Sequence, residues 1–216
     1  MKLVAPSILS VDPANLPEAI ALAESSGADY IHIDIMDGVF VPRKTWDVSL
    51  VKQIKGTHTL FNDVHIMVEK PWIVGPEFAK AGADNVTFHL EACQNEEEVR
   101  KTISLIEEAG AKASVSIKPN TPIEAVYPYL DSVYLVLIMS VEPGRGGQQF
   151  IDGALEKIKT LRKKIGDSKS PLIEVDGGIN ATFGPLCYQA GADILVSGSY
   201  LYGHPDFAKR LKGLKE

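Results

Sequence analysis

The sequence predicts a single α/β domain, a (β/α)8 barrel of the TIM type, over residues 1–216. Eight strand-like segments alternate with helix-like segments, and no composition break or long Gly/Ser linker divides the chain. The 216 residues are 45% hydrophobic and 23% charged, which suits one sizeable core. A doubly wound open sheet is the structural alternative, but its G-x-G-x-x-G fingerprint is absent.

A weak repeat indicates where helices end and strands begin. Ser/Ala-Gly-Ala-Asp occurs at 26–29, 81–84 and 190–193, with Ala-Gly-Ala-Lys at 109–112 as a variant. Glycine just after a helix adopts the left-handed conformation that ends it, so each repeat is typical of an αβ turn. Strands are therefore expected near residues 3–9, 30–36, 60–68, 85–91, 112–118, 134–141, 172–176 and 194–199.

The second expected strand carries polar side chains on one face of an apolar segment. Within 30–36, three isoleucines alternate with His32, Asp34 and Met36. Successive side chains on a strand point to opposite faces, so His32 and Asp34 project from the same side. In a (β/α)8 barrel, the reactive groups lie where inward side chains converge at the C-terminal ends of the strands.

The third and seventh strands offer further candidate residues at the C-terminal end of the barrel. Asp63, His65 and Met67 share one parity, and the segment 172–176 ends at Asp176 before two glycines. Alone, a strand histidine is more often structural, and Asp before Gly-Gly is often only a turn. Their shared placement at strand ends instead favours one divalent metal site. Nitrogen and oxygen ligands suit Zn, Mn, Fe or Co, and the candidates are His32, Asp34, His65 and Asp176.

The fourth and fifth strands carry polar residues with other interpretations. His89 shares parity with Thr87 and Glu91 and is interpreted as polar lining outside the site. Lys118, at the end of the fifth strand, stands where a barrel aldolase places its Schiff-base lysine, so a Schiff-base lyase is a rival function. The Asp-x-Lys-x-x-Asp run of the orotidine-decarboxylase type of barrel is absent.

Glycine-rich segments follow the last three strands and predict an anion site. Val-Glu-Pro-Gly-Arg-Gly-Gly-Gln-Gln-Phe occupies 141–150, Asp-Gly-Gly occupies 176–178 and Ser-Gly-Ser occupies 197–199. Small turns let backbone N–H groups approach a phosphate closely, and the loops after strands seven and eight commonly bind phosphate in this fold. Each segment alone is explained by a tight turn, but together they favour a phosphorylated small molecule.

Composition and charge argue against several classes of partner. Lys and Arg total 22 against 28 Asp and Glu, so the chain lacks the basic excess expected for binding nucleic acid or an anionic membrane. The longest strongly apolar stretch, 133–141, is too short to span a bilayer, and no signal peptide is recognised. Cys93 and Cys187 lack metal or redox spacing and are expected to be reduced thiols of a cytoplasmic protein.

Several of these segments together resemble the ribulose-phosphate 3-epimerase family. Its signatures occur in the family's order at 5–10, 32–42, 63–68, 88–92, 141–148, 175–179 and 197–199. The resemblance implies a ribulose-phosphate-binding type of barrel and a metal-dependent interconversion of D-ribulose 5-phosphate and D-xylulose 5-phosphate by inversion at C3, in the pentose phosphate pathway. D-allulose 6-phosphate 3-epimerase and a phosphate-sugar binding protein without catalysis remain alternatives.

The resemblance also implies roles for individual residues. It makes Asp34 and Asp176 the acid/base pair, since inversion beside a ketone needs a base on each face. It implies a divalent ion, with zinc expected first, bound by His32, Asp34, His65 and Asp176, no organic cofactor, and a homo-oligomer. Met36, Met67 and Met139 are expected beside the reacting carbons. Substrate contacts are expected from Ser7, His32, His65, Gly146, Gly147, Gln148, Asp176, Gly177, Gly178, Gly198 and Ser199.

Two loops near the expected mouth depart from the family pattern. Arg-Lys-Thr-Trp-Asp at 43–47 stands where many members have Asn-Ile-Thr-Phe-Gly, and Arg145 replaces the phenylalanine of a common Pro-Gly-Phe-Gly-Gly loop. Neither departure replaces a proposed ligand. They bear instead on the choice between a pentulose and a hexulose phosphate.

Overall fold

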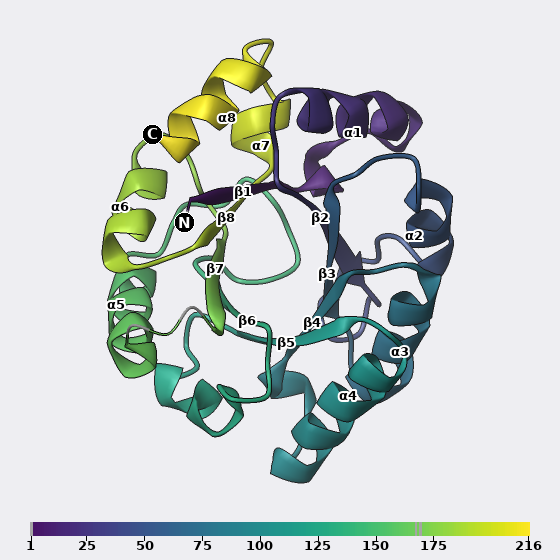
Figure 1. The fold of residues 1–216 in the computed structure, drawn as a ribbon, viewed down its shortest axis with the longest axis vertical. Coiled ribbons are helices and arrows are strands. Elements are labelled where there is room, and N and C mark those ends of the chain that lie inside the picture. The colour runs from purple at the N-terminus through teal and green to yellow at the C-terminus, as the bar shows by residue number, and fades with distance from the viewer. Residues whose placement is uncertain (1, 167, 169) are drawn as a thin grey trace.

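The computed structural model describes residues 2–166, 168 and 170–216 and confirms the predicted barrel. Eight parallel strands form one sheet in the order β1-β8-β7-β6-β5-β4-β3-β2, with helices around it (Figure 1). Each strand lies inside an expected segment. The strands are β1 (Leu3–Pro6), β2 (Tyr30–Met36), β3 (Phe61–Met67), β4 (Asn85–His89), β5 (Lys112–Ile117), β6 (Leu135–Met139), β7 (Leu172–Asp176) and β8 (Ile194–Ser197).

The barrel closes at a seam between β1 and β2, the two strands at the ends of the sheet. Parallel pairing runs continuously from β1 through β8 and round to β2. An isolated bridge between Ser7 and His32 then joins the two ends of the sheet. The seam therefore lies beside two residues of the expected site.

Helices cover the outer face of the strands, as Figure 1 shows. They are α1 (Leu16–Ser25), α2 (Val48–Ile54), α3 (Pro71–Ala81), α4 (Glu96–Glu108), α5 (Gly153–Ile165), α6 (Phe183–Ala190), α7 (Ser199–Tyr202) and α8 (Phe207–Lys215). The crossover from β5 to β6 is the 3-10 helix η4 (Ile123–Tyr129), which contains Pro128. Proline lacks the N–H that an α-helix interior requires.

The predicted αβ turns have the expected geometry. Gly82 ends α3 and Gly191 ends α6, with φ of 117° and 114° respectively. Only glycine enters this left-handed region without steric cost, so the repeat supplies helix C-caps.

The inside of the barrel has an apolar part and a polar part. One cluster of buried side chains comes mostly from β1, β6 and β8: Ala5, Tyr30, Leu135, Leu137, Met139, Val141, Ile194 and Val196. Strands β2 to β5 and β7 contribute buried polar side chains: His32, Asp34, Asp63, His65, Asn85, Thr87, His89, Ser114, Ser116 and Glu174. Buried polar groups cost free energy unless they are hydrogen-bonded, so this part is expected to form a network.

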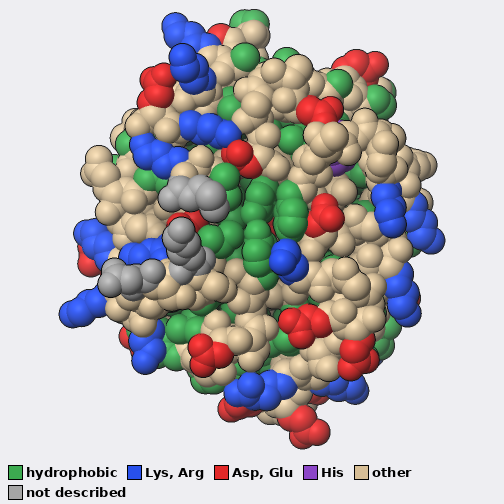
Figure 2. Space-filling model, viewed as in Figure 1, with side chains coloured by type: hydrophobic (Ala, Val, Ile, Leu, Met, Phe, Trp, Pro, Cys, Tyr) green, Lys and Arg blue, Asp and Glu red, His purple; other side chains and the backbone are tan. Residues whose placement is uncertain are grey.

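Aromatic side chains close the barrel at the end where its strands begin. The Phe61 ring centroid lies 4.5 Å from that of Tyr30 and 5.8 Å from that of Tyr134, and the two tyrosine hydroxyls are 2.6 Å apart. Figure 2 shows hydrophobic side chains over the centre of the barrel on the face that it presents. A ligand therefore enters from the C-terminal ends of the strands. Within the described ranges, no helix is long and apolar enough to cross a membrane.

Candidate active site and metal centre

Four side chains from β2, β3 and β7 converge at the C-terminal mouth of the barrel. His32, Asp34, His65 and Asp176 each offer one ligand atom, and these atoms all lie within 4.8 Å of one another. Asp34 Oδ1 lies 3.5 Å from His32 Nε2 and 3.3 Å from His65 Nδ1. The structure thus brings together all four ligands that the sequence predicted.

The chemistry of these donors fits a divalent cation. His32 Nε2 is buried without a hydrogen-bond partner in the described part of the chain. Its other ring nitrogen, Nδ1, lies 2.6 Å from Asp63 Oδ2, so a proton on Nδ1 leaves the Nε2 lone pair facing the site. Two imidazoles and two carboxylates suit zinc and its neighbours in the periodic table. The group can therefore hold a metal ion.

The two aspartates of the mouth differ in their affinity for a proton. Burial opposes the ionisation of Asp34, but His32 and His65 outweigh it and lower the pKa of Asp34 well below its usual range. Burial, followed by the nearby Asp34 carboxylate, raises the pKa of Asp176 to about 7. Two carboxyl groups whose pKa values are pushed apart are typical of an acid/base pair.

The histidines also respond to their surroundings. Burial favours neutral His32, but the carboxylates of Asp34 and Asp63 raise its pKa well above the usual value. Burial lowers the pKa of His65. In the metal-free site a proton on His32 therefore supplies positive charge between the carboxylates.

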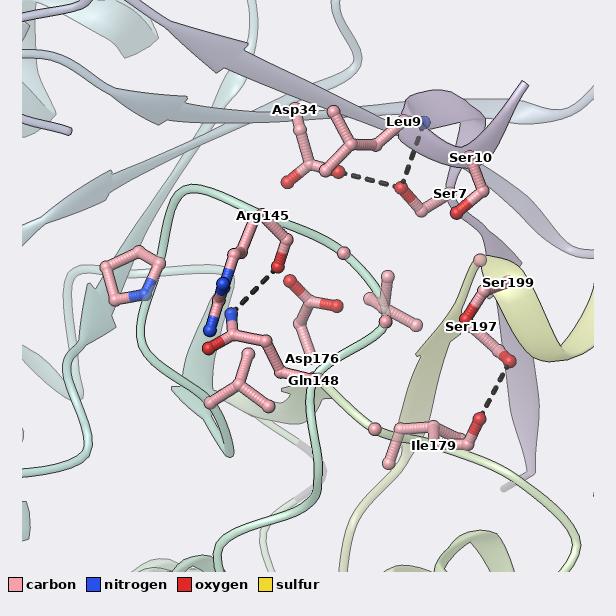
Figure 3. Close-up of a pocket in the computed structure, with 18 of the residues that line it drawn as sticks. Ser7, Leu9, Ser10, Asp34, Arg145, Gln148, Asp176, Ile179, Ser197 and Ser199 are labelled. Carbon is pink, nitrogen blue, oxygen red and sulfur yellow. Dashed lines mark hydrogen bonds between the residues drawn. The ribbon is translucent and has the colours of Figure 1, made fainter. Parts of the chain in front are cut away.

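A cavity of about 400 Å³ opens above this cluster (Figure 3). Asp34 and Asp176 reach it from separate strands. Its walls include most of the expected substrate contacts, namely Ser7, Gly146, Gly147, Gln148, Asp176, Gly177, Gly178, Gly198 and Ser199. His32 and His65 are fully buried, and in the structure as described they do not line the cavity.

Three methionines form part of the cavity wall. Met36, Met67 and Met139 end β2, β3 and β6, and all three line the cavity while being almost fully buried. Thioethers are polarizable and apolar, so they contact carbon atoms without competing for polar groups. They line the cavity, as expected, and their contact with reacting carbons stays a prediction.

Ser7 holds one oxygen of Asp34. Its hydroxyl donates to Asp34 Oδ2 at 2.7 Å, while Leu9 N–H donates to Ser7 Oγ at 3.3 Å. Figure 3 shows both contacts. Oδ1 of Asp34 is thereby directed at the histidines, and Oδ2 lies in the wall of the cavity.

The glycine loops after β7 and β8 meet at another side of the cavity. Gly177 and Gly178 have φ of 120° and 63°, in the region that favours glycine. A Cβ atom would lie 2.6 Å from the backbone nitrogen of Phe150 if added to Gly178, and 2.6 Å from Ser10 Oγ if added to Gly198. The N–H groups of Gly177, Gly178 and Gly198 donate no backbone hydrogen bond to other described residues, which leaves them available to an anion.

Gln148 stabilises the loop after β6, in which it lies. Gln148 Nε2 donates to the backbone oxygens of Glu142 and Arg145 at 2.7 and 2.8 Å. Arg145, one of the departures from the family pattern, is exposed and lines the cavity, and Figure 3 shows it beside Gln148. This residue can therefore contact a bound ligand.

The other departing segment, 43–47, supports β2 instead. Thr45 Oγ1 donates to the backbone oxygen of Asp34 at 2.7 Å and accepts from the backbone N–H of Met36 at 2.9 Å. Asp47 caps α2 by accepting from the N–H of Ser49 at 2.8 Å. All five residues are described, and none of them lines the cavity. The segment thus acts on the site through β2.

Sequence reasoning left out several buried polar residues next to the proposed ligands. His89 Nε2 lies 2.9 Å from His65 Nε2, so its interpretation as lining outside the site is incomplete. Asp63 contacts His32, and Glu174 Oε1 lies 4.0 Å from His32 Nδ1. Burial and Asp63 raise the pKa of Glu174 well above its usual value. Strand parity indicated that Asp63 and His89 face inward, but not which side chain each one meets.

Lys118 lies away from the cavity. Its Nζ is 4.0 Å from the ring centroid of Phe40, and among the described residues it is not part of the cavity wall. A Schiff-base lysine has to reach the substrate carbonyl, so the geometry does not support the lyase alternative.

Comparisons with known sequences show what the chain is similar to. Residues 3–202 match the model of a family described as the ribulose-phosphate 3 epimerase family. The ribulose-phosphate 3-epimerase of Bacillus subtilis is 46% identical over 215 residues, covering 98% of this chain and 97% of the relative. The chloroplastic ribulose-5-phosphate-3-epimerase of Arabidopsis thaliana is 44% identical over 214 residues, covering 99% and 76% respectively.

Solved structures with the same fold are more distant in sequence. KGPDC from Streptococcus mutans, in a ligand complex, has a TM-score of 0.73 at 14% identity, covering 99% of this chain and 95% of that one. A 3-hexulose-6-phosphate synthase has a TM-score of 0.68 at 19% identity, covering 100% and 98%. At these identities the likeness concerns the fold alone.

Proposed function

Because the chain belongs to the ribulose-phosphate 3-epimerase family, we propose that it inverts C3 of D-ribulose 5-phosphate to give D-xylulose 5-phosphate, with Asp34 and Asp176 as its two acid/base groups. The protein is an epimerase and hence an isomerase, like relatives of 46% and 44% identity that span its length. The observation that carries the mechanism is that Asp34 and Asp176 reach one cavity from separate strands, within a group of side chains that can hold a metal ion.

The two aspartates share the proton transfer. Inversion beside a ketone removes the C3 proton from one face and returns a proton to the other. Asp34, whose lowered pKa keeps it ionised, is in the form that can accept a proton, and Asp176, with a pKa of about 7, can carry a proton to give. The roles exchange in the reverse reaction. Ser7 keeps the Asp34 carboxylate in place through its bond to Oδ2.

We propose that His32, Asp34, His65 and Asp176 hold one divalent cation, and that no organic cofactor is needed. Zinc, iron, manganese and cobalt are the ions to test. When bound, the cation supplies Lewis acidity that stabilises negative charge on the C2 and C3 oxygens of the substrate. His32 and His65 present opposite ring nitrogens to the site, Nε2 and Nδ1.

We propose that the glycine loops bind the phosphate of the ketose. Gly177, Gly178 and Gly198 all line a cavity of about 400 Å³, a size that suits a small metabolite. An anchored phosphate holds C3 between the two aspartates and converts remote binding energy into orientation. A homo-oligomer and a cytoplasmic location, expected at the outset, remain predictions.

An isotope experiment tests this function. The purified protein, supplied with a divalent cation, is incubated with ribulose 5-phosphate in deuterated water. We expect xylulose 5-phosphate to form and deuterium to enter at C3, because the proton passes through exchangeable carboxyl groups. Absence of both would overturn the proposal. Allulose 6-phosphate, assayed in parallel, measures preference for a hexulose phosphate, and borohydride trapping of an adduct on Lys118 would support the lyase instead.

Replacement of Asp176 by asparagine tests the acid/base assignment. The amide keeps the size of the side chain but cannot accept the proton, so we expect the turnover rate to fall by about 10²- to 10⁴-fold. Metal content is measured in the same preparation. A variant that keeps metal and near-normal turnover would exclude Asp176 from proton transfer. Asp131→Asn, at an exposed carboxylate outside the cavity wall, is the matched control.

A further inference from the structure

Each proposed histidine ligand has a second ring nitrogen with its own partner inside the barrel. His32 Nδ1 meets Asp63 Oδ2 directly at 2.6 Å. His65 Nε2 lies 2.9 Å from His89 Nε2, and His89 Nδ1 lies 3.2 Å from Glu91 Oε2. We propose that His89, held by Glu91, is a positioning residue that fixes the tautomer and orientation of His65 for metal binding. The proposal rests on the metal site of the proposed function.

The hydrogen bonds run from His65 through His89 to Glu91, and their direction follows from the number of protons that these groups can hold. Two ring nitrogens 2.9 Å apart form a hydrogen bond only when one of them carries a proton. His65 points Nδ1 at the site, 3.3 Å from Asp34 Oδ1. A cation bound to Nδ1 would leave the proton of His65 on Nε2, from where it is donated to His89 Nε2. His89 then carries its own proton on Nδ1 and donates it to Glu91 Oε2.

Glu91 is held so that one of its oxygens faces His89. Its other oxygen, Oε1, accepts hydrogen bonds from the backbone N–H of Lys118 at 2.7 Å and from the hydroxyl of Thr121. Both donors belong to the segment that follows β5. These hydrogen bonds therefore link β3, β4 and the loop after β5, and that loop fixes their last acceptor.

Burial makes the tautomer of His65 depend on this contact. His65 and His89 are both 0% exposed, so water does not replace a lost partner. Without an acceptor at position 89, a buried N–H of His65 is left unpaired, which is unfavourable. The alternative is to move the proton to Nδ1, which removes the lone pair that would bind the metal. His89 thus controls whether His65 is available as a ligand.

Metal affinity in three variants tests the positioning role. His89→Gln keeps an oxygen that can accept from His65, and His89→Leu removes the acceptor at similar volume. Ser116→Ala is the control, because Ser116 is the register partner of His89, is equally buried, and has no hydrogen-bond partner among the described residues. Cobalt(II) binding to the metal-free proteins is measured by visible absorption and chelator competition.

We expect His89→Leu to weaken cobalt binding by about 10- to 100-fold, and His89→Gln and Ser116→Ala to stay within about threefold of the parent. Parent-like affinity in His89→Leu would overturn the proposal. An equal loss in His89→Gln or in Ser116→Ala would also overturn it, because the effect would then be one of packing.

Nitrogen-15 NMR of the zinc-loaded parent gives a readout that does not depend on activity. We expect the proton of His65 on Nε2 and that of His89 on Nδ1. The opposite tautomers would contradict the proposed direction of the hydrogen bonds. A parent that binds no cobalt defeats both this inference and the proposed metal site. A protein that binds cobalt with the expected variant pattern but does not epimerise ribulose 5-phosphate refutes the proposed function alone.

Discussion

Asp34 and Asp176 are the same residue type in two environments, and their surroundings separate their chemistry. Asp34 Oδ2 accepts a hydrogen bond from Ser7, and Oδ1 faces two imidazoles. These contacts favour its charged form. The carboxyl group of Asp176 is buried and lies near the charge of Asp34, and both effects favour its neutral form. At the scale of single residues, neighbouring groups therefore determine which aspartate is suited to act as base and which as acid.

Glu91 provides a residue-scale prediction of pH dependence. Burial opposes its ionisation, but hydrogen bonds from His89, Thr121 and Lys118 lower its pKa from 4.5 to about 2. A depressed pKa stabilises the folded state above the unfolded pKa, and that stability is lost as pH falls from near 4.5 toward 2. Relative to Glu91→Gln, we expect the metal-free parent to lose about 2 kcal/mol of unfolding free energy between pH 7 and pH 3.

Urea denaturation of both proteins at the two pH values measures this difference. An equal response of parent and variant to acid would contradict the shifted pKa of Glu91.

Gly178 gives a second prediction at this scale. Its φ of 63° and the backbone of Phe150, 2.6 Å from an added Cβ, leave no room for a side chain. We expect Gly178→Ala to lower the unfolding free energy by about 1–3 kcal/mol. Chemical denaturation measures it, and an unchanged midpoint would show that the loop relaxes freely.

Single elements explain how a polar site fits into a hydrophobic barrel. In β2, Ile31, Ile33 and Ile35 pack in the core between strands and helices. His32 and Asp34 alternate with them and face the inside, so one strand serves both the core and the site. Thr45 then fixes the end of this strand through bonds to two of its backbone groups. The segment 43–47 therefore supports a ligand-bearing strand through Thr45, the one position at which it agrees with the family pattern.

Helix α8 carries the element-scale prediction. Gly213 lies inside this helix, and no atom lies within 4 Å of a Cβ built on it. Alanine is favoured over glycine in a helix by roughly 0.5–1 kcal/mol. We expect Gly213→Ala to raise the melting temperature of the protein, in contrast to Gly178→Ala. A lower melting temperature in calorimetry would count against an unobstructed helical position.

At the scale of the whole molecule, β1 and β2, the strands at the two ends of the sheet, meet at the candidate active site. An isolated bridge between Ser7 and His32 joins β1 to β2, and the proposed ligands lie on β2, β3 and β7. A cation bound there would link strands that lie on both sides of this seam. Metal binding and closure of the barrel are therefore expected to support one another.

Removal of the metal tests this coupling. Since the ion binds the folded state, a free concentration about 100 times its dissociation constant adds about 2.7 kcal/mol to the unfolding free energy. We expect chelation to lower stability and to speed amide hydrogen exchange in β1 and β2 more than in β4 and β5. Uniform acceleration in all strands would argue against a special role of the seam.

Alternation within strands was enough to predict much of the fold and the site. The inward parity of His32, Asp34, His65 and Asp176 follows from the period of two of a β-strand, and the glycine turns follow from conformations that other residues avoid. These are local properties of the chain. They located the eight strands, and they placed among the inward-facing side chains the four that the structure brings within 4.8 Å.

The contacts between strands depend on register and packing, which a single strand does not specify. Only the tertiary structure joined His89 to His65 and Asp63 to His32, because these pairs are 24 and 31 residues apart in the chain. It also decided the opposite pKa shifts of Asp34 and Asp176, since burial and neighbouring charge arise when strands close into a barrel. The sequence by itself determined which groups face inward, and the closed barrel determined which partner each group meets.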